Sequence, residues 1–347
     1  MTARKLRWGI ISTGKIAGTF ARSLAESQTG ELVSVASRTP EGASAFAAEF
    51  GVARAHGSYQ ALLADPEVEA VYIATPHPGH AHWSIAAARA KKHVLCEKPL
   101  GMNYAEVSAI VQAARDNDVF LMEAFMYRCH PQTREVVRLL RAGVLGKVKA
   151  IHASFGIDGA YPANHRVLNH ELGGGGILDV GCYPVSMARL VAGVANGEPF
   201  SEPLSLHALG HVGESSRVDE YASAILKFPG EILASLSTAV QLWQENSVRI
   251  FGSEGRMLLR TPWHPAHAAD AAGRSEIVIE RPKQADEIIV VPAPGTIYSY
   301  EIDAVRAQLQ QRQAAEMSWA DSLGNAQTLD RWRQALGVTF AADHAEA

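Results

Sequence analysis

Short apolar runs alternate with helical patterns through the first 124 residues, and no other feature constrains the fold as strongly. The apolar runs lie at residues 8–12, 32–36, 68–75, 94–96 and 119–122. Strands that alternate with helices at this pace predict an open, parallel, doubly wound sheet with right-handed crossovers. A chain of 347 residues exceeds one comfortable core, so we expect a second domain. We therefore predict an α/β fold with a first domain at residues 1–124 and a second at 125–347.

The turn after the first apolar run has the features of a dinucleotide-binding turn. It reads GIISTGKIA over residues 9–17, with Ser12 in place of the first glycine of G-x-G-x-x-G/A and with Gly14 and Ala17 in the other two places. Gly14 allows close approach of a pyrophosphate, which would bind at the free N–H groups of the helix N-terminus. A glycine near a helix start is also common in ordinary connections. We predict that the turn contacts the cofactor through Ser12, Thr13, Gly14, Lys15 and Ile16.

The end of the second apolar run favours NADP over NAD. An NAD site usually has a carboxylate here, whereas this chain has Ser37 and Arg38. A hydroxyl followed by a guanidinium suits a 2′-phosphate. The alternative is that Arg38 is an ordinary surface arginine, so NAD remains possible.

Three histidines follow the third long apolar run. His77, His80 and His82 are irregularly spaced, without a cysteine pair or an HExxH helix, so we predict no metal site. Thr75 and Pro76 end the strand, and His80 begins the next helix. Because ligands bind outside the carboxyl ends of parallel strands, we expect these residues to line the cofactor crevice.

The stretch HVLCEKPL over residues 93–100 places charged residues where a buried strand ends. Val94 to Cys96 forms the strand, and Pro99 stops it because proline cannot donate to a ladder. Glu97 and Lys98 would therefore lie at the ligand-binding edge of the sheet. Lys98 is a candidate catalytic residue, although a lysine at a strand end is often simply solvated.

The second half of the chain predicts a different architecture. Strands are expected at 148–157, 205–212, 221–228, 232–240, 247–251, 256–259, 276–279 and 287–291. Short turns join most of them, so they should form a mostly antiparallel sheet within an α+β domain. Terminal helices are expected at 297–311 and 318–336, and we leave open that they pack back on the first domain. An uncovered sheet face would favour a homodimer or homotetramer.

A polar loop, four glycines and a helix occur in succession in this half. The loop spans residues 158–171, the glycines are residues 173–176, and the helix is expected over 177–190. The glycines allow either a close backbone approach to a flat cofactor ring or a flexible connector. Asp179 and Tyr183 are four apart, so we place them on one face of the helix, one turn from each other.

Composition narrows the partners and the compartment. The net charge of −4 and the pI of about 6.4 argue against a broad electrostatic grip on nucleic acid. No run approaches the roughly 18 consecutive apolar residues of a membrane helix, so we expect no membrane partner. Three widely separated cysteines predict reduced thiols in a cytoplasmic protein.

These motifs together resemble the Gfo/Idh/MocA oxidoreductase family over almost the whole chain. The matching segments are GIISTGKIA (9–17), SR (37–38), TPHPGH (75–80), EKPL (97–100), EAFMYR (123–128) and GGGGILDVGCYP (173–184). Within the family, the chain is most similar to NADP-dependent D-xylose dehydrogenases and dimeric dihydrodiol dehydrogenases. The resemblance implies a Rossmann domain followed by an α+β domain. It also implies that Lys98 is the EKP lysine, that Tyr183 is the catalytic tyrosine, and that Asp179 is the acidic residue preceding it.

The resemblance further implies a carbohydrate or diol substrate and a set of residues that bind it. Relatives often carry N-x-R-x-D-P in the polar loop. Asn164 and Arg166 match this pattern, whereas the residues around His170 depart from it, which leaves the substrate open. The predicted substrate residues are Tyr127, Asn164, Arg166, Asp179 and Tyr183.

Proton transfer by tyrosine requires help, because a free phenol has a pKa of about 10. A nearby lysine ammonium favours the phenolate and lowers that pKa. We therefore expect Tyr183 to act as acid/base and Lys98 to assist it and hydrogen-bond the reacting oxygen. Asp179 would position Lys98 or a neighbouring hydroxyl. Each residue also has an ordinary reading, as a core tyrosine, a solvated lysine and a helix-start aspartate.

Two other functions are compatible with these residues. One is a glycosidase-like enzyme that oxidises a sugar transiently with tightly held NAD. The other is a non-catalytic NAD(P)-sensing protein, since a fold does not determine function.

Overall fold

The computed structural model describes residues 4–157, 159–265 and 273–344, and the chain divides into two compact units. Unit 1 comprises residues 1–129 and 295–323, and unit 2 comprises residues 130–294 and 324–347. The segment 295–323, which contains the first of the expected terminal helices, is therefore part of unit 1. Asp158, the first residue of the predicted polar loop, lies outside the described residues.

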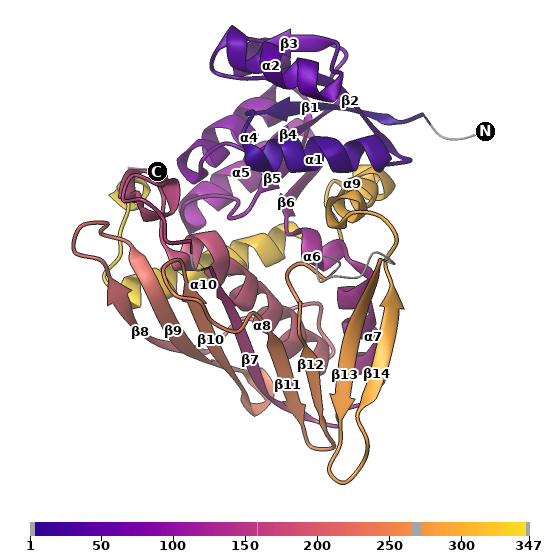
Figure 1. The fold of residues 1–347 in the computed structure, drawn as a ribbon, viewed down its shortest axis with the longest axis vertical. Helices are drawn as coiled ribbons and strands as arrows, with labels where there is room; N and C mark the ends of the chain where they lie inside the picture. The colour runs from indigo at the N-terminus through magenta and orange to yellow at the C-terminus, as the bar shows by residue number, and fades with distance from the viewer. Residues whose placement is uncertain (1–3, 158, 266–272, 345–347) are drawn as a thin grey trace. The chain divides into compact units, whose positions relative to one another are not determined.

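Unit 1 is built on a six-stranded parallel sheet, drawn from indigo to magenta in Figure 1. Its strands are β1 (Leu6–Ile11), β2 (Gly30–Ala36), β3 (Arg54–His56), β4 (Ala70–Ile73), β5 (His93–Glu97) and β6 (Leu121–Ala124). The strand order is β3-β2-β1-β4-β5-β6, and every neighbouring pair is parallel. The predicted doubly wound parallel sheet is confirmed. Its order reverses between β1 and β4, which is where such sheets bind ligands.

Helices connect these strands and complete unit 1. They are α1 (Lys15–Glu26), α2 (Pro40–Phe50), α3 (Tyr59–Leu63), α4 (His80–Arg89), α5 (Tyr104–Asn117), α6 (Met126–Cys129) and α9 (Ile297–Gln308), with 3₁₀ turns η1 (His77–Gly79) and η6 (Leu309–Gln311). The start of α5 has a side-chain cap, in which Asn103 Oδ1 accepts the N–H of Glu106 at 2.9 Å. The Glu106 carboxylate accepts the N–H of Met102 at 2.8 Å, so its bond is made one residue before the cap.

Two short elements of unit 1 were not expected. Strand β3 has three residues and pairs only at the edge of the sheet with β2, so it has no apolar run to signal it. Helix α6 is a single turn whose four residues are all buried, and it directly follows β6. Elements this short depend on tertiary packing rather than on local pattern.

Unit 2 is built on an eight-stranded sheet, visible along the lower part of Figure 1. Its strands are β7 (Val148–Gly156), β8 (Ser205–Val212), β9 (Asp219–Phe228), β10 (Ile232–Ala239), β11 (Val248–Gly252), β12 (Arg256–Leu259), β13 (Arg274–Glu280) and β14 (Glu287–Pro292). The order is β14-β13-β12-β11-β7-β10-β9-β8, in which β7 and β10 are parallel and the other neighbours are antiparallel. The mostly antiparallel sheet is confirmed.

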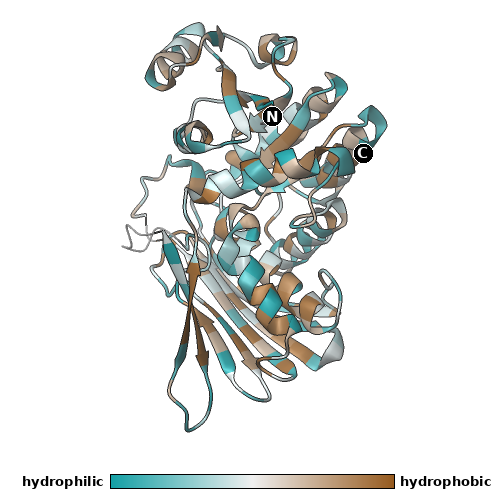
Figure 2. Cartoon of the chain, turned by 90° about the vertical axis from the view of Figure 1, so that its right-hand side faces the viewer, coloured by the Kyte–Doolittle hydropathy of each residue, from teal (hydrophilic) through white to brown (hydrophobic). Residues whose placement is uncertain are grey.

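Helices pack on one face of this sheet and leave the other face open. The longer helices are α7 (Pro131–Arg141), α8 (Cys182–Ala195) and α10 (Trp319–Ala335), with short turns η2 (Arg166–Leu168), η3 (His170–Leu172), η4 (Ile177–Gly181), η5 (Pro229–Glu231) and η7 (Ala341–His344). The start of α10, up to residue 323, belongs to unit 1. Helix α8 contacts β7 and β10, and α7 contacts β13 and β14. Figure 2 shows hydrophobic and hydrophilic positions along the strands. On β9, buried residues alternate with exposed or half-buried ones, as expected for a sheet covered on one side.

One segment is apolar enough to cross a membrane by length and composition. It spans His170–Ala195, and its most apolar window is 100% buried inside the protein. Complete burial against β7, β10 and α7 is the environment of a core helix. The sequence rule of a continuous apolar run did not select this segment, because charged residues interrupt it.

Candidate active site

The turn after β1 has the open helix N-terminus that an anionic ligand requires. Gly14 is the N-cap of α1, and no side chain among the described residues caps this helix. A Cβ built on Gly14 would have only Ser12 Oγ within 4 Å, at 3.8 Å, so the space over the turn is open. Free N–H groups at such a terminus attract phosphate. The turn therefore fits a dinucleotide pyrophosphate.

Ser12 has a backbone conformation that normally requires glycine. Its φ is 97°, in the region that side chains rarely occupy, and its N–H donates to Ala36 O at 3.0 Å. The position therefore keeps the geometry of the first fingerprint glycine although the residue is serine. Backbone strain of this kind is frequent at ligand-binding sites. The adjacent Thr13 hydroxyl lies 3.2 Å from that of Ser37, which joins the ends of β1 and β2.

A tyrosine that sequence reasoning missed lies beside the predicted phosphate residues. The Tyr59 hydroxyl lies close to the Ser12 side chain and to the charge of Arg38. Burial raises the pKa of Tyr59, and Arg38 and Ser12 partly oppose that rise. Arg38 itself is exposed. Tyr59 begins the short helix after β3, a position with no motif to single it out.

His80 joins two loops at the carboxyl edge of the sheet. It is 1% exposed, and its Nδ1 and Nε2 lie 2.8 Å from Pro99 O and 2.9 Å from Thr75 O. These contacts fix the loop after β4 relative to the segment that carries Lys98. The structure therefore gives His80 a positioning role, and its contact with a nicotinamide stays a prediction.

Thr75 fits a cofactor contact for a separate reason. Its side chain is 9% exposed, and its Oγ1 has no hydrogen-bond partner within the described residues. A buried hydroxyl of this kind is costly unless something binds it. The adjacent Pro76 is exposed at the end of β4. Within the same described part of the chain, no group of three His, Cys, Asp or Glu residues is placed to hold a metal ion.

Glu97 faces the interior of unit 1 more than sequence reasoning expected. It is 8% exposed, and the hydroxyl of the fully buried Tyr72 donates to its Oε1. Behind this pair, burial raises the pKa of Glu301 well above its usual value, and the negative charge of Glu97 raises it further. The neighbouring Lys98 is half-buried at the end of β5. Cofactor contact by Glu97 stays a prediction.

In unit 2, the segment carrying Asp179 and Tyr183 differs from the single α-helix that was expected. Residues 177–181 form the π-helical turn η4, and α8 begins at Cys182. Pro184 has no N–H, so the α-helical bond to Val180 O cannot form, which accounts for the break. The assumption of α-helical spacing between Asp179 and Tyr183 is corrected accordingly. Single π turns of this kind are frequent at functional sites.

Tyr183 lies among aromatic side chains. It is 4% exposed, and its ring centroid is 5.2 Å from that of Phe155 and 5.7 Å from that of Trp263. Trp263 Nε1 donates to Ser154 O at 2.9 Å, which fixes the indole. Phe155 and Trp263 were not predicted as site residues. A lone tryptophan after a short strand carries no local functional signal.

Asp179 is paired with a residue from the polar loop. Arg166 donates to Asp179 Oδ1 at 3.0 Å, and Asp179 is 3% exposed. Tyr161, from the same loop, is stacked on His165 with ring centroids 4.1 Å apart. Burial raises the pKa of Tyr161, and the charge of Asp179 raises it further, so Tyr161 also lies close to this pair.

The remaining predicted substrate residues are more dispersed. Asn164 is exposed in the polar loop. His170, where the chain departs from the family's loop pattern, contacts the C-terminal segment: its Nε2 lies 2.7 Å from Thr339 O. Tyr127 is 0% exposed within unit 1 and lies beside Arg128, and its contact with substrate stays a prediction. Lys98 and the pair Asp179 and Tyr183 belong to different units, so their meeting stays a prediction.

Three of the four glycines pack closely against protein atoms on the side where a Cβ would stand. A Cβ on Gly174 would lie 2.6 Å from Val167 O, and one on Gly175 would lie 2.3 Å from Asp219 Oδ1. A Cβ on Gly176 would lie 3.3 Å from the Thr238 side chain. Protein atoms therefore occupy the space beside these residues. On this side the glycines allow the chain to pack against itself, and a close approach to a flat cofactor ring stays a prediction.

Comparison with known proteins adds independent information. A family model described as an oxidoreductase family with an NAD-binding Rossmann fold matches residues 6–125, and a GFO/IDH/MocA C-terminal domain model matches residues 133–258. A trans-1,2-dihydrobenzene-1,2-diol dehydrogenase from Danio rerio is 36% identical over 343 residues, covering 97% of this chain and 99% of that protein. The Mus musculus enzyme of the same name is 34% identical, covering 97% and 99%.

Solved structures are similar over the same length. A 3-ketoreductase from Actinomadura kijaniata, in complex with NADP and TDP-benzene, superposes with a TM-score of 0.83 at 29% identity, covering 96% of this chain and 98% of that one. An aldose-aldose oxidoreductase from Caulobacter crescentus has a TM-score of 0.84 at 23% identity, covering 96% and 97%. The second likeness concerns the fold alone.

Proposed function

Because the chain belongs to the GFO/IDH/MocA oxidoreductase family, we propose that Lys98 and Tyr183 act together in hydride transfer between NADP(H) and a sugar or cyclic diol. The chain is an NAD(P)-dependent oxidoreductase acting on a CH–OH or C=O group. The residues that perform the reaction are part of the proposal. The observation that supports them most is the buried Tyr183 phenol, which stands among Phe155 and Trp263.

The residues of unit 1 fit the dinucleotide. The open N-terminus of α1 would hold the pyrophosphate, and Ser37 and Arg38 would hold the 2′-phosphate. Thr75 Oγ1 would supply a polar contact further along the crevice, and Lys98 would lie near the reacting end. When bound, the nicotinamide supplies the hydride chemistry.

The protein itself transfers the proton in this reaction. In the oxidation direction, the Tyr183 phenolate takes the proton of the substrate hydroxyl. The substrate carbon that bears this hydroxyl gives up hydride to the oxidised nicotinamide, and a carbonyl forms. In reduction, the phenol returns that proton to the carbonyl oxygen. In the proposed arrangement, the Lys98 ammonium would stabilise the Tyr183 phenolate and hydrogen-bond the same oxygen. The ion pair of Arg166 and Asp179 offers charged donors and acceptors for further substrate hydroxyls.

The aromatic surroundings support a ring-shaped substrate. Phe155, Trp263 and Tyr183 present ring faces and edges, against which the C–H faces of a sugar or cyclic diol can pack. The dihydrodiol dehydrogenases and the 3-ketoreductase named above act, by their names, on cyclic diols and on a ketone. We therefore favour a cyclic substrate with adjacent hydroxyls.

The test combines a substrate screen with two variants. Aldoses, cyclic diols and keto-sugars are screened by the absorbance of reduced nicotinamide, which also separates net redox from a transient oxidation. We expect Tyr183→Phe and Lys98→Met each to lower kcat about a hundredfold or more, the scale of lost acid–base catalysis. NADPH binding, followed by fluorescence, should persist in Tyr183→Phe. Tyr104→Phe, at an exposed residue of unit 1, is the matched control, and normal turnover of Tyr183→Phe would refute the assignment.

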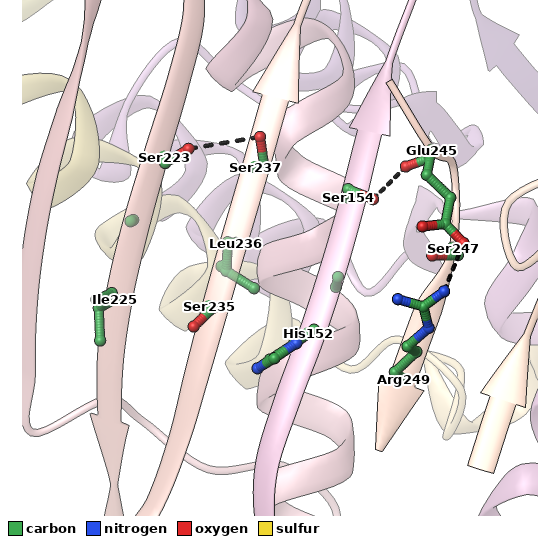
Figure 3. A pocket seen from close by; sticks show the side chains of 12 residues that line it. His152, Ser154, Ser223, Ile225, Ser235, Leu236, Ser237, Glu245, Ser247 and Arg249 are labelled. Atoms are coloured by element: carbon green, nitrogen blue, oxygen red, sulfur yellow. Dashed lines mark hydrogen bonds and ion pairs between the residues drawn. The ribbon is translucent and has the colours of Figure 1, made fainter. Parts of the chain in front are cut away.

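We propose in addition that two copies associate through the open face of the unit 2 sheet. Leu209, Ile225 and Leu233 are 84%, 56% and 48% exposed on neighbouring strands of this face. Figure 3 shows Ser223, Ser235 and Ser237 near Ile225 on these strands. The four residues line a shallow hollow of about 380 Å³. Apolar residues interleaved with small ones form a flat surface that a second copy of itself can cover. A homotetramer would need a second contact surface.

Light scattering of the purified protein tests this association. We expect a dimer mass for the native chain and a monomer mass for Ile225→Glu, because the introduced charge would be buried at the contact. Tyr104→Glu places the same charge on an exposed residue of unit 1 and should leave the dimer intact. A monomeric native chain would contradict the proposal.

The cysteines support the cytoplasm as the compartment. Cys96, Cys129 and Cys182 are buried thiols, as expected of a protein in a reducing compartment. Cell fractionation of the tagged protein tests this, and recovery from a secreted fraction would contradict it.

A further inference from the structure

A buried acid lies at the start of the segment that carries Asp179 and Tyr183. Asp219 is the first residue of β9, is 1% exposed, and accepts the N–H of Ile177 on its Oδ2 at 2.6 Å. The N–H of Gly176 lies close enough to stabilise the carboxylate as well. Ile177 is the first residue of η4, so this carboxylate binds the N–H groups that a helix leaves unsatisfied at its start.

The backbone around Asp219 is shaped to admit its carboxylate. Gly175 has φ of 106°, and a Cβ there would lie 2.3 Å from Asp219 Oδ1. On the other side, Thr238 Oγ1 donates to Gly176 O at 3.0 Å. The start of η4 is thus held by a side chain from β9 and another from β10, which are neighbouring strands of the sheet.

We propose that Asp219 is a positioning residue for the reaction: its carboxylate anchors the start of η4 and thereby fixes where Asp179 and Tyr183 stand in unit 2. The proposal rests on the function assigned above, in which Tyr183 moves the proton. A π turn lacks the regular bonding of an α-helix, so its orientation depends on such an anchor. Anchoring to two strands of a sheet makes the segment rigid, which a proton-transfer group requires.

The strength of this anchor depends on pH, because it depends on whether Asp219 is ionised. Burial raises the pKa of Asp219 to about 7, while the N–H groups of Ile177 and Gly176 and the charge of Arg333 on α10 lower it. Its Oδ1 has no hydrogen-bond partner among the described residues and would take up the proton. Protonation removes the negative charge that the helix start favours. The anchor is therefore strongest above about pH 7, where Asp219 is ionised.

The experiment compares Asp219→Ala and Asp219→Asn with Glu220→Gln as the control. Glu220 is the neighbouring acid, half-buried, and its carboxylate accepts from Ser216 rather than from η4. We expect Asp219→Ala to lower kcat about tenfold or more, with little change in NADPH affinity, because a small misplacement of a reacting group is costly. Asp219→Asn keeps an acceptor oxygen and should retain most of kcat. It should lose the inflection near pH 7 in the kcat profile, and Glu220→Gln should behave as the native enzyme.

The outcomes separate this proposal from the function on which it rests. If Tyr183→Phe is inactive while Asp219→Ala is folded and has native kcat, the anchor is refuted and the assignment of Tyr183 stands. If Tyr183→Phe is fully active, the catalytic assignment fails whatever Asp219 does. If Asp219→Ala does not fold, Asp219→Asn decides: an unchanged pH profile refutes the anchor, and loss of the inflection supports it.

Discussion

Replacing Arg38 by methionine should change which nicotinamide cofactor the protein prefers. Arg38 follows β2 where an NAD site usually carries a carboxylate, and its guanidinium is the proposed partner of the 2′-phosphate. Methionine keeps an unbranched apolar stem but removes the charge and every donor. The neighbouring Ser37 hydroxyl, held 3.2 Å from that of Thr13, remains in place. The substitution therefore isolates the contribution of the charge.

The size of the effect follows from where Arg38 lies. Hydrogen bonds to charged groups contribute about 1.5–3 kcal/mol, which is roughly 10- to 150-fold in affinity. Because Arg38 is exposed, solvent and salt weaken its attraction, so the lower end of that range applies. We expect NADPH to bind about tenfold more weakly to Arg38→Met, while NADH binding stays unchanged because NADH has no 2′-phosphate.

Fluorescence titration with NADPH and NADH measures both affinities at low and at physiological salt. The loss of NADPH affinity should shrink as salt rises, since the interaction removed is electrostatic. Arg22→Met, on the exposed side of α1, is the matched control and should bind both cofactors normally. If Arg38→Met weakens NADH and NADPH equally, Arg38 does not read the 2′-phosphate, and the preference for NADP must be argued from other residues.

Two further predictions concern buried charges in unit 1. Arg128 and Asp321 pair at 2.6 Å with side chains 4% and 2% exposed, so Asp321→Asn should lower the free energy of unfolding by about 3–5 kcal/mol, measured by urea titration. A loss under 1 kcal/mol, roughly that of an exposed pair, would contradict this reasoning. Burial raises the pKa of the Glu301 carboxyl in the folded protein above its value in the unfolded chain. The neutral carboxyl therefore costs the fold nothing at acid pH, and the folded protein loses stability as pH rises through the folded pKa and the buried group ionises. Glu301→Gln should therefore match the native protein in acid and exceed its stability in alkali, and equal stabilities at alkaline pH would refute that sign.

Strand and helix positions were predictable where a local pattern repeats over several residues. Strand β8 was expected over residues 205–212 and occupies those residues, and β12 likewise matches 256–259. The start of α10 obeys a local rule of the same kind, since Ser318 Oγ accepts the N–H of Asp321 at 3.2 Å. Elements without a pattern, such as β3, could be found only through their pairing partners.

The candidate site was predictable in its motifs but not in its contacts. The turn at Gly14 and the strand end at Lys98 follow from local rules about parallel sheets. The contact of Tyr59 with Ser12 joins residues from different loops, and that of Asp219 with Ile177 joins residues 42 apart. Pairing at such separations depends on the strand order, which the sequence pattern does not specify.

The segment from Gly173 to Pro184 shows why local rules fail where they do. Four glycines and a proline all weaken an α-helix, so propensity alone argues against the helix that the apolar pattern favours. The structure satisfies both signals, because a π turn accommodates the missing N–H of Pro184 and the glycines admit Asp219 and Thr238. A residue that opposes its local structure needs a compensating contact elsewhere in the fold, and such contacts gather at functional sites. The violation of helix propensity beside Tyr183 is therefore itself an argument that this segment has a function beyond packing.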